Sequence, residues 1–188
     1  MLINRFIPIL LSLLLIFTTR AYAMESKRSI SRAYFAGGCF WGVEYFFEKQ
    51  EGVIDVISGY MGGESENPTY EEVSYTHTNH VEVVEVHYDD RKVDYETLAR
   101  LFFETHDPTQ TGGQGPDIGD QYSSVIFYSN ESEKKISEKL IKLLEAKGLK
   151  IATQLKTVMP FWRAEEYHQD YYSRKGGTPY CHGYVKRF

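Results

Sequence analysis

The chain has 188 residues, is 42% hydrophobic and carries a formal net charge of −5. This length suits one domain with a hydrophobic core. The acidic balance argues against binding to the phosphate backbone of nucleic acid, so we expect no nucleic-acid partner.

Residues 1–23 are typical of a secretory signal peptide. Arg5 precedes the apolar run Phe6–Phe17, and the small residues Ala21 and Ala23 frame a cleavage site. The run is short for a membrane span. We therefore expect cleavage after Ala23, export to the periplasm or the medium, and no membrane attachment afterwards. Residues 24–188 are expected to form a single domain.

Hydrophobic periodicity predicts alternating strands and helices along the rest of the chain. Two polar stretches are predicted as loops: 63–79, with at most one helical turn, and 105–121, which is long and glycine-rich. The alternation predicts an α/β (α+β) fold, a two-layer sandwich with helices on one face of the sheet. Strands are predicted at 31–36, 53–62, 80–88, 122–128 and 151–159, and helices at 39–50, after Asp94, after Asn130 or Ser132, and at 164–175.

Cys39 lies at the junction between the first strand and the first helix, after Gly37 and Gly38. A helix start stabilises a thiolate, and the glycines permit a sharp turn that leaves the sulfur accessible. Phe40 and Trp41, which follow directly, could form the walls of an apolar pocket. The alternative is a structural disulfide with Cys181, the usual state of two cysteines in an exported protein. That alternative explains the glycines poorly, so we favour a reactive Cys39.

Cys181 lies in the glycine-rich C-terminal segment, residues 176–184. We expect this tail to be mobile, so that the thiol can approach an oxidised Cys39 and form a disulfide with it.

Glu82 alternates with Val84 and Val86 on one face of a predicted strand. A carboxyl group among valines is desolvated, and desolvation raises its pKa until it can donate a proton near neutral pH. If the strand lies at the sheet edge, Glu82 faces water instead. Alternation alone leaves both possibilities open.

Tyr70 and Tyr122 lie in or beside loops, where a phenol could bind a substrate oxygen. The histidines do not have the spacing of a structural zinc site, so we expect no metal. A Cys–His hydrolase pair, with His168 or His182 as the base, remains open.

Six segments together resemble the class A peptide methionine sulfoxide reductases, which act on the S epimer of the sulfoxide. These segments are "GCFWG" (38–42), "NPTYEEV" (67–73), "HVEVVEVHYD" (80–89), "FFETHDPTQ" (102–110), "DIGDQYSS" (117–124) and "AEEYHQDYY" (164–172). The resemblance implies a fold related to the ferredoxin-like arrangement and one catalytic domain over 24–188. The chain departs from the family in its C-terminal tail, which has one candidate resolving cysteine where some relatives have two.

The resemblance also implies roles for individual residues. Cys39 would be the nucleophile and Phe40 and Trp41 the walls around the substrate methyl group. Cys181 would resolve a sulfenic acid on Cys39. The groups around the sulfoxide oxygen would be Tyr70, Glu82, Tyr122 and, as a supporting acid, Asp117.

The expected partners are oxidised proteins or peptides that carry methionine-S-sulfoxide, and a thioredoxin-like protein or dithiol as reductant. No cofactor is expected, and the protein is expected to be a monomer. The main alternative is another exported thiol oxidoreductase, such as a cysteine peroxidase or disulfide exchanger. A non-enzymatic binding module with a buried disulfide is the second alternative.

Overall fold

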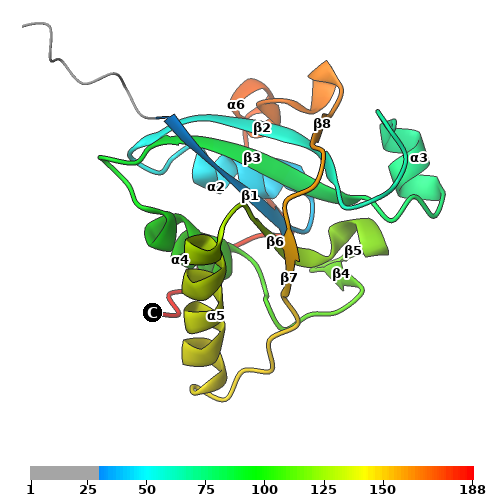
Figure 1. Cartoon of the computed structure of the whole chain (residues 1–188). Helices are drawn as coiled ribbons and strands as arrows, with labels where there is room; N and C mark the ends of the chain where they lie inside the picture. Colours follow the sequence, from blue (N-terminus) through cyan, green and yellow to red (C-terminus); the bar gives the residue numbers. More distant parts are fainter. Residues whose placement is uncertain (1–29) are drawn as a thin grey trace, which may run out of the picture.

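A computed structural model describes residues 30–188, so the predicted signal peptide lies outside the described residues. A six-stranded sheet has the order β7-β6-β1-β3-β2-β8 (Figure 1). All neighbours are antiparallel except β6 and β7, which are parallel. Its strands are β1 (Ile30–Gly37), β2 (Val53–Met61), β3 (Val81–Asp89), β6 (Ser124–Tyr128), β7 (Gln154–Thr157) and β8 (Trp162–Arg163).

Three helices cover one face of the sheet and bury its main hydrophobic core. They are α2 (Phe40–Phe47), α4 (Tyr95–Thr105) and α5 (Glu131–Glu145). The Asp94 side chain accepts the N–H of Thr97 and caps α4, and Asn130 accepts the N–H groups of Ser132 and Glu133 and caps α5. Asn130 rather than Ser132 is therefore the cap.

The other face carries a smaller cluster that includes Tyr34, Val83 and Phe127. Val158 and Phe161, on the segment between β7 and β8, pack against it. The predicted two-layer sandwich is confirmed. Its central unit β1-α2-β2-β3-α4-β6, with strand order β6-β1-β3-β2, is the ferredoxin-like arrangement.

Two insertions lie in the predicted loops. The first contains α3 (Tyr70–Tyr75), whose N-cap Thr69 forms a capping box with Glu72. The second contains the hairpin β4 (Gly113–Gln114) and β5 (Asp117–Ile118), followed by the 3₁₀ turn η1 (Asp120–Tyr122). The long glycine-rich stretch is therefore ordered in part, and Tyr122 belongs to a turn rather than to the start of β6.

The predicted helix over 164–175 is wrong as one element. The chain forms the 3₁₀ turn η2 (Glu166–His168) and then α6 (Tyr171–Lys175). Asp170 lies between them with a φ of 51°, a left-handed conformation that a continuous helix does not contain. Sequence periodicity also did not predict β8, because it has two residues.

Strand directions bring several segments to one end of the sheet. β1 ends there, and its antiparallel neighbour β3 begins there, since Phe35 pairs with Val84. β6 begins there as well, because Gly37 pairs with Ser124. The starts of α2 and β3, α3 and η1 therefore lie close together. Over residues 30–188, no helix combines the length and apolar character needed to cross a membrane.

Candidate active site

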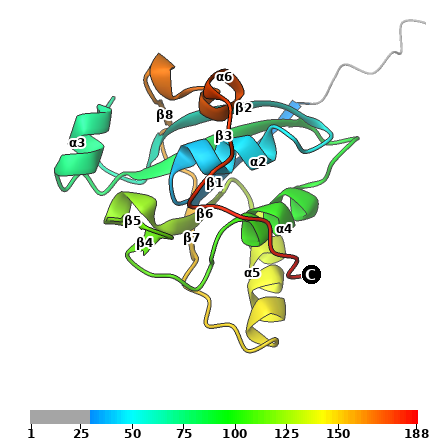
Figure 2. The ribbon, with the colours of Figure 1, turned by 180° about the vertical axis from the view of Figure 1, so that it is seen from behind.

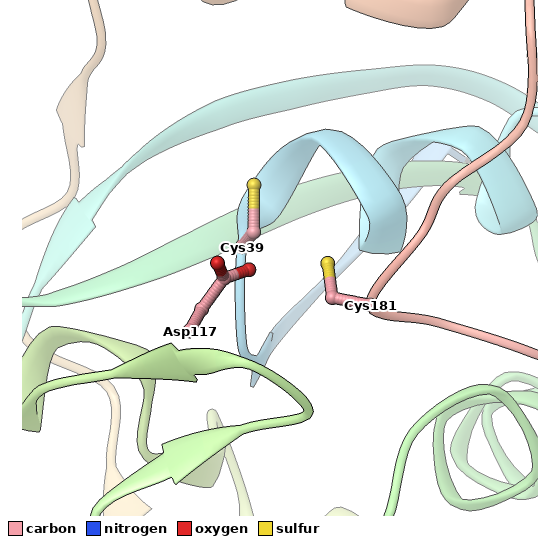
Figure 3. A group of neighbouring side chains, drawn as sticks. All are labelled: Cys39, Asp117 and Cys181. Atoms are coloured by element: carbon pink, nitrogen blue, oxygen red, sulfur yellow. The ribbon is translucent and has the colours of Figure 1, made fainter.

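Cys39 is the N-cap residue of α2, one position before the helix rather than within its first turn. Gly38 makes the preceding turn with a φ of 100°, which favours glycine. The Cys39 side chain is 8% exposed. Its sulfur, the sulfur of Cys181 and a carboxylate oxygen of Asp117 lie within 4.8 Å of one another (Figure 3). Both cysteines are free thiols in this structure.

The two thiols interact directly, and this interaction moves their pKa values apart. The contact with Cys181, burial and the charge of Glu82 raise the pKa of Cys39. The backbone N–H of Trp41 lowers this pKa by a smaller amount. The same contact, reinforced by His182, lowers the pKa of Cys181 to about 6. In the dithiol state the charge therefore depends on the coupled pair of thiols, and not on the helix start alone. The contact between the two thiols and the contact with His182 both favour the charge on Cys181.

Glu82 lies at the start of β3 and is 1% exposed. Its Oε2 accepts the backbone N–H of Phe40 at 2.9 Å. Burial raises the pKa of Glu82 to about 8, against a smaller opposite effect of that hydrogen bond. Because β3 is flanked by β1 and β2, the alternative of an edge strand with a hydrated glutamate is wrong.

Tyr70 and Tyr122 approach the same place from the two insertions. Burial raises the pKa of Tyr122, and the charges of Glu82, Tyr70, Cys39 and Asp117 add to this effect. Burial and Glu82 also raise the pKa of Tyr70, which interacts with the Tyr122 hydroxyl. Both phenols therefore remain protonated donors at physiological pH.

Phe40 and Trp41 occupy different environments. Phe40 is 1% exposed and packs on Tyr60 with ring centroids 5.8 Å apart. Trp41 is half-buried, stacks on Tyr171 at 3.8 Å, and donates its indole N–H to Nδ1 of His168 at 3.0 Å. His168 also lies against Phe40. Trp41 is thus held in one orientation at the edge of the core.

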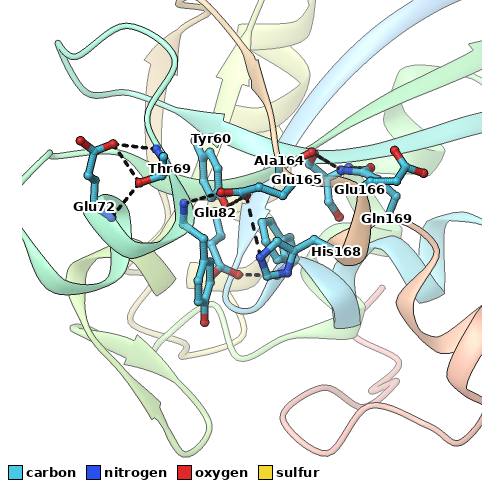
Figure 4. A network of polar contacts seen from close by, with 12 residues as sticks. Tyr60, Thr69, Glu72, Glu82, Ala164, Glu165, Glu166, His168 and Gln169 are labelled. Atoms are coloured by element: carbon cyan, nitrogen blue, oxygen red, sulfur yellow. Dashed lines mark hydrogen bonds and ion pairs between the residues drawn. The ribbon is translucent and has the colours of Figure 1, made fainter.

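A hydrogen-bond network behind these rings fixes α3 against the sheet (Figure 4). Glu165 accepts the backbone N–H of Tyr70 at 2.8 Å and the hydroxyl of Tyr60 at 2.9 Å. Gln169 bonds to both the N–H and the carbonyl of Ser58 on β2. The segment after β8 therefore positions Tyr70.

Asp117 lies on the β4–β5 hairpin and points toward the two sulfurs (Figure 3). Its Oδ1 accepts the hydroxyl of Tyr180 at 3.0 Å. Its Oδ2 is buried and has no hydrogen-bond partner among the described residues. An acceptor is therefore available beside the thiols.

The C-terminal segment is docked rather than mobile. Figure 2 shows it running from α6 past α2 to α4. Glu104 on α4 accepts the Tyr184 hydroxyl at 3.0 Å and the backbone N–H groups of Arg187 and Phe188 at 2.9 and 3.2 Å. Cys181 is 9% exposed. The expected swinging tail is corrected, because these contacts hold Cys181 beside Cys39 in the dithiol state.

Five histidines have distinct hydrogen-bond partners, and no histidine belongs to a group of possible metal ligands within residues 30–188. His80 bonds to Gly63 and Ser65, and His87 to Glu85. His106 bonds to Phe102 and Ser124. For the hydrolase alternative, the decisive positions are those of His168 and His182.

Neither candidate base is paired with Cys39. His168 accepts from Trp41, whereas His182 contacts Cys181, with its Nδ1 3.1 Å from the sulfur. The possible hydrolase pair with Cys39 is therefore not formed, and the contact between a histidine and a thiol involves Cys181 instead.

Sequence reasoning missed Glu104, Glu165 and Gln169 as residues that support the site. Their partners lie 80 or more residues away in the chain, so no local pattern indicates them. The usable signal for Glu165 and Gln169 was the family-like segment 164–172.

A family model described as peptide methionine sulfoxide reductase matches residues 31–188. Among curated relatives, peptide methionine sulfoxide reductase MsrA from Nautilia profundicola is 45% identical over 80% of this chain and 87% of its own length. MsrA from Sulfolobus acidocaldarius is 47% identical over 79% and 85%.

Solved structures agree. Reduced Mxr1 from Saccharomyces cerevisiae has a TM-score of 0.75 and 32% identity, covering 81% of this chain and 89% of that one. Methionine sulfoxide reductase A of Corynebacterium diphtheriae has a TM-score of 0.72 and 34% identity, covering 82% and 80%. Mxr1 from Saccharomyces cerevisiae in complex with Trx2 shares the fold, with a TM-score of 0.56. It is 22% identical, and the match covers 86% of this chain and 96% of that one. The chain belongs to the peptide methionine sulfoxide reductase family, in its class A.

Proposed function

We propose that the protein reduces methionine-S-sulfoxide, free or within oxidised proteins and peptides, to methionine. The observation that carries this proposal is the buried Glu82, which has a pKa of about 8 and is anchored to the residue after Cys39. An acid that keeps its proton at neutral pH suits a reaction in which a sulfoxide oxygen must be protonated. Family membership supports the same activity.

In the first step, the Cys39 sulfur attacks the sulfoxide sulfur while Glu82 protonates the oxygen. Tyr70 and Tyr122, as protonated phenols, donate hydrogen bonds to that oxygen. Substrate entry separates the two thiols and removes the largest effect that raises the pKa of Cys39. The backbone N–H of Trp41 then favours the Cys39 thiolate. The oxygen is transferred to Cys39 as a sulfenic acid, and methionine leaves.

The thioether methyl group is held by the aromatic side chains. Phe40 supplies a buried apolar surface and Trp41 a wall whose orientation His168 and Tyr171 maintain. Asp117, which has a free acceptor oxygen, supports the polar side of the site.

In the second step, Cys181 condenses with the sulfenic acid, forming a Cys39–Cys181 disulfide and water. A thioredoxin-like protein then returns both thiols. The solved complex of yeast Mxr1 with Trx2 supports this choice of reductant. No metal or organic cofactor is required, because the two thiols supply both electrons.

We also propose that the protein works after export, in the periplasm or medium, as a monomer. The signal-like residues 1–23 support export. The amino-terminal sequence of the mature protein and its elution volume test these two points.

The proposal is tested by giving the purified protein and a dithiol the S and R epimers of a blocked methionine sulfoxide separately. We expect turnover of the S epimer alone. Cys39→Ser should abolish it, whereas Cys181→Ser, assayed without the dithiol, should form one methionine per protein and no intramolecular disulfide. Hydrogen peroxide as the substrate tests the peroxidase alternative.

Absence of methionine from either epimer, with a folded and reduced protein, contradicts the proposal. Rapid peroxide turnover under those conditions would favour the cysteine peroxidase instead.

A further inference from the structure

His182 follows the second thiol directly in the chain and is in contact with it. Its Nδ1 lies 3.1 Å from the Cys181 sulfur, and its Nε2 lies 2.8 Å from the carbonyl oxygen of Gly37. A carbonyl oxygen can only accept, so Nε2 must carry a hydrogen. In the neutral ring Nδ1 is then an acceptor, aimed at the thiol.

The ring is held in place by the turn that carries Cys39. His182 is 9% exposed, and a Cβ added at Gly42 would collide with its Nδ1. A Cβ added at Gly38 would collide with Gln114, which lines the other side of this turn. Gly42 therefore gives His182 its space, and Gly38 allows the turn.

We infer that His182 is the general base of the disulfide-forming step, taking the proton of Cys181 at Nδ1 while Gly37 holds its tautomer. This inference deepens the proposed function and rests on it. Cys181 loses its proton to His182, and its sulfur attacks the sulfur of the Cys39 sulfenic acid. The new S–S bond replaces the S–O bond, and the departing hydroxide takes the proton as water. Cys181 is oxidised and Cys39 is reduced.

The need for a base arises from the order of events. In the dithiol, the Cys39 thiol is the largest influence that lowers the pKa of Cys181. Once Cys39 carries oxygen, that thiol hydrogen is gone. His182 is then the neighbour that remains to stabilise a Cys181 thiolate, since Asp117 opposes it.

Other titratable groups around this pair influence its pH response. His106 on α4 interacts electrostatically with His182, and Arg187 interacts with His106. The groups that interact electrostatically with the two thiols are Glu82 on β3, Asp117 on β5, Tyr70 on α3, Tyr122 on η1, Tyr172 on α6 and Tyr180 in the tail.

The test separates the two steps by single turnover without reductant. The reduced protein is mixed with one equivalent of S-sulfoxide, and methionine, free thiols and sulfenic acid trapped by dimedone are followed. His182→Asn and His182→Gln both place an amide near the thiol but cannot take its proton. His87→Gln, at the far end of β3 and paired with Glu85, is the matched control.

We expect both His182 variants to form one methionine at the wild-type rate and then to accumulate sulfenic acid. Disulfide formation at pH 6.5 should slow on the order of 100-fold, the usual size of a general-base effect. The deficit should disappear above pH ~9, where an ordinary thiol ionises unaided. A purely structural defect would persist at that pH.

Disulfide formation at the wild-type rate in either variant at pH 6.5, or a deficit independent of pH, overturns the inference. Absence of methionine from the wild type overturns the proposed function instead. In that event, the sulfenic acid is generated with one equivalent of hydrogen peroxide, and the second step is measured as before.

Discussion

The Oε2 atom of Glu82 accepts the backbone N–H of Phe40 at 2.9 Å, so a buried acid on a central strand is joined to the residue that follows Cys39. Burial without a cation explains why this acid retains its proton, with a pKa of about 8. Its protonation state therefore links the reaction and the stability of the fold to pH.

Replacement of Glu82 by Gln should remove the proton donor without removing the acceptor for the Phe40 N–H. We expect the single-turnover rate of methionine formation to fall on the order of 100-fold or more. In the wild type this rate should decline above about pH 8, where Glu82 ionises. A rate in Glu82→Gln equal to that of the control Glu71→Gln would remove Glu82 from the mechanism.

Stability should also change with pH through Glu82. Between its ordinary pKa of 4.5 and about 8, the folded protein holds a proton that the unfolded chain has released. The free energy of unfolding therefore falls as pH rises through this window, in total on the order of 4 kcal/mol. Glu82→Gln should lose this slope and be more stable than the wild type at pH 8. Urea titrations at pH 5 and pH 8 measure it.

Glu44 is a second buried acid, with a pKa raised by burial to about 7, and it contributes a similar slope to both proteins. The decisive quantity is thus the difference between wild type and Glu82→Gln in the pH slope of the unfolding free energy. Equal slopes in the two would contradict the prediction for Glu82.

Gly42→Ala should be harmful although alanine usually stabilises a helix by about 1 kcal/mol relative to glycine. The added Cβ would collide with the His182 ring. We expect slower disulfide formation and a lower melting temperature. The control is Gly183→Ala, where a Cβ would meet nothing within 4 Å. A Gly42→Ala protein that is more stable than the wild type and forms the disulfide at the normal rate would contradict this prediction, because the position of the His182 ring would then not matter for the reaction.

Glu104→Ala should release the end of the tail, because one carboxylate accepts three hydrogen bonds from it. We expect a loss of about 1–3 kcal/mol in unfolding free energy. Disulfide formation should slow several-fold, while the first methionine should form normally. Limited proteolysis should cut the tail sooner than in Glu145→Ala, an exposed control on α5. Equal cleavage of both proteins would contradict the docking role.

The elements that could be predicted from the sequence are those governed by local periodicity. Alternation in β3 predicted a strand but left the burial of Glu82 open. The cap at Asp94 followed from short-range hydrogen bonding, and the second cap was narrowed to Asn130 or Ser132. The turn at Cys39 was predicted from its glycines, although the residue proved to be the cap itself.

The rest depends on contacts between distant residues. The break at Asp170 coincides with two long-range contacts: Gln169 bonds to Ser58 on β2, and Tyr171 on α6 stacks on Trp41 of α2. Docking of the tail needs Glu104, and the raised pKa of Cys39 arises mainly from Cys181, 142 positions away. The docking of the tail and the coupling between the two thiols therefore could not be predicted from local sequence, for the same physical reason.

The pairing of β1 with β3 places Cys39 and Glu82 in a region of high local stability, whereas Cys181 lies in a region of lower local stability. The register that joins Phe35 to Val84 places Glu82 next to the end of β1, so Cys39 and the acid can separate only if the central strands come apart. Amide hydrogens there should exchange with solvent only through global unfolding. Cys181 is held by side chains and a few backbone contacts, and amides around it should exchange through smaller openings. A reductant could thus reach the Cys39–Cys181 disulfide without separating Glu82 from the turn that carries Cys39.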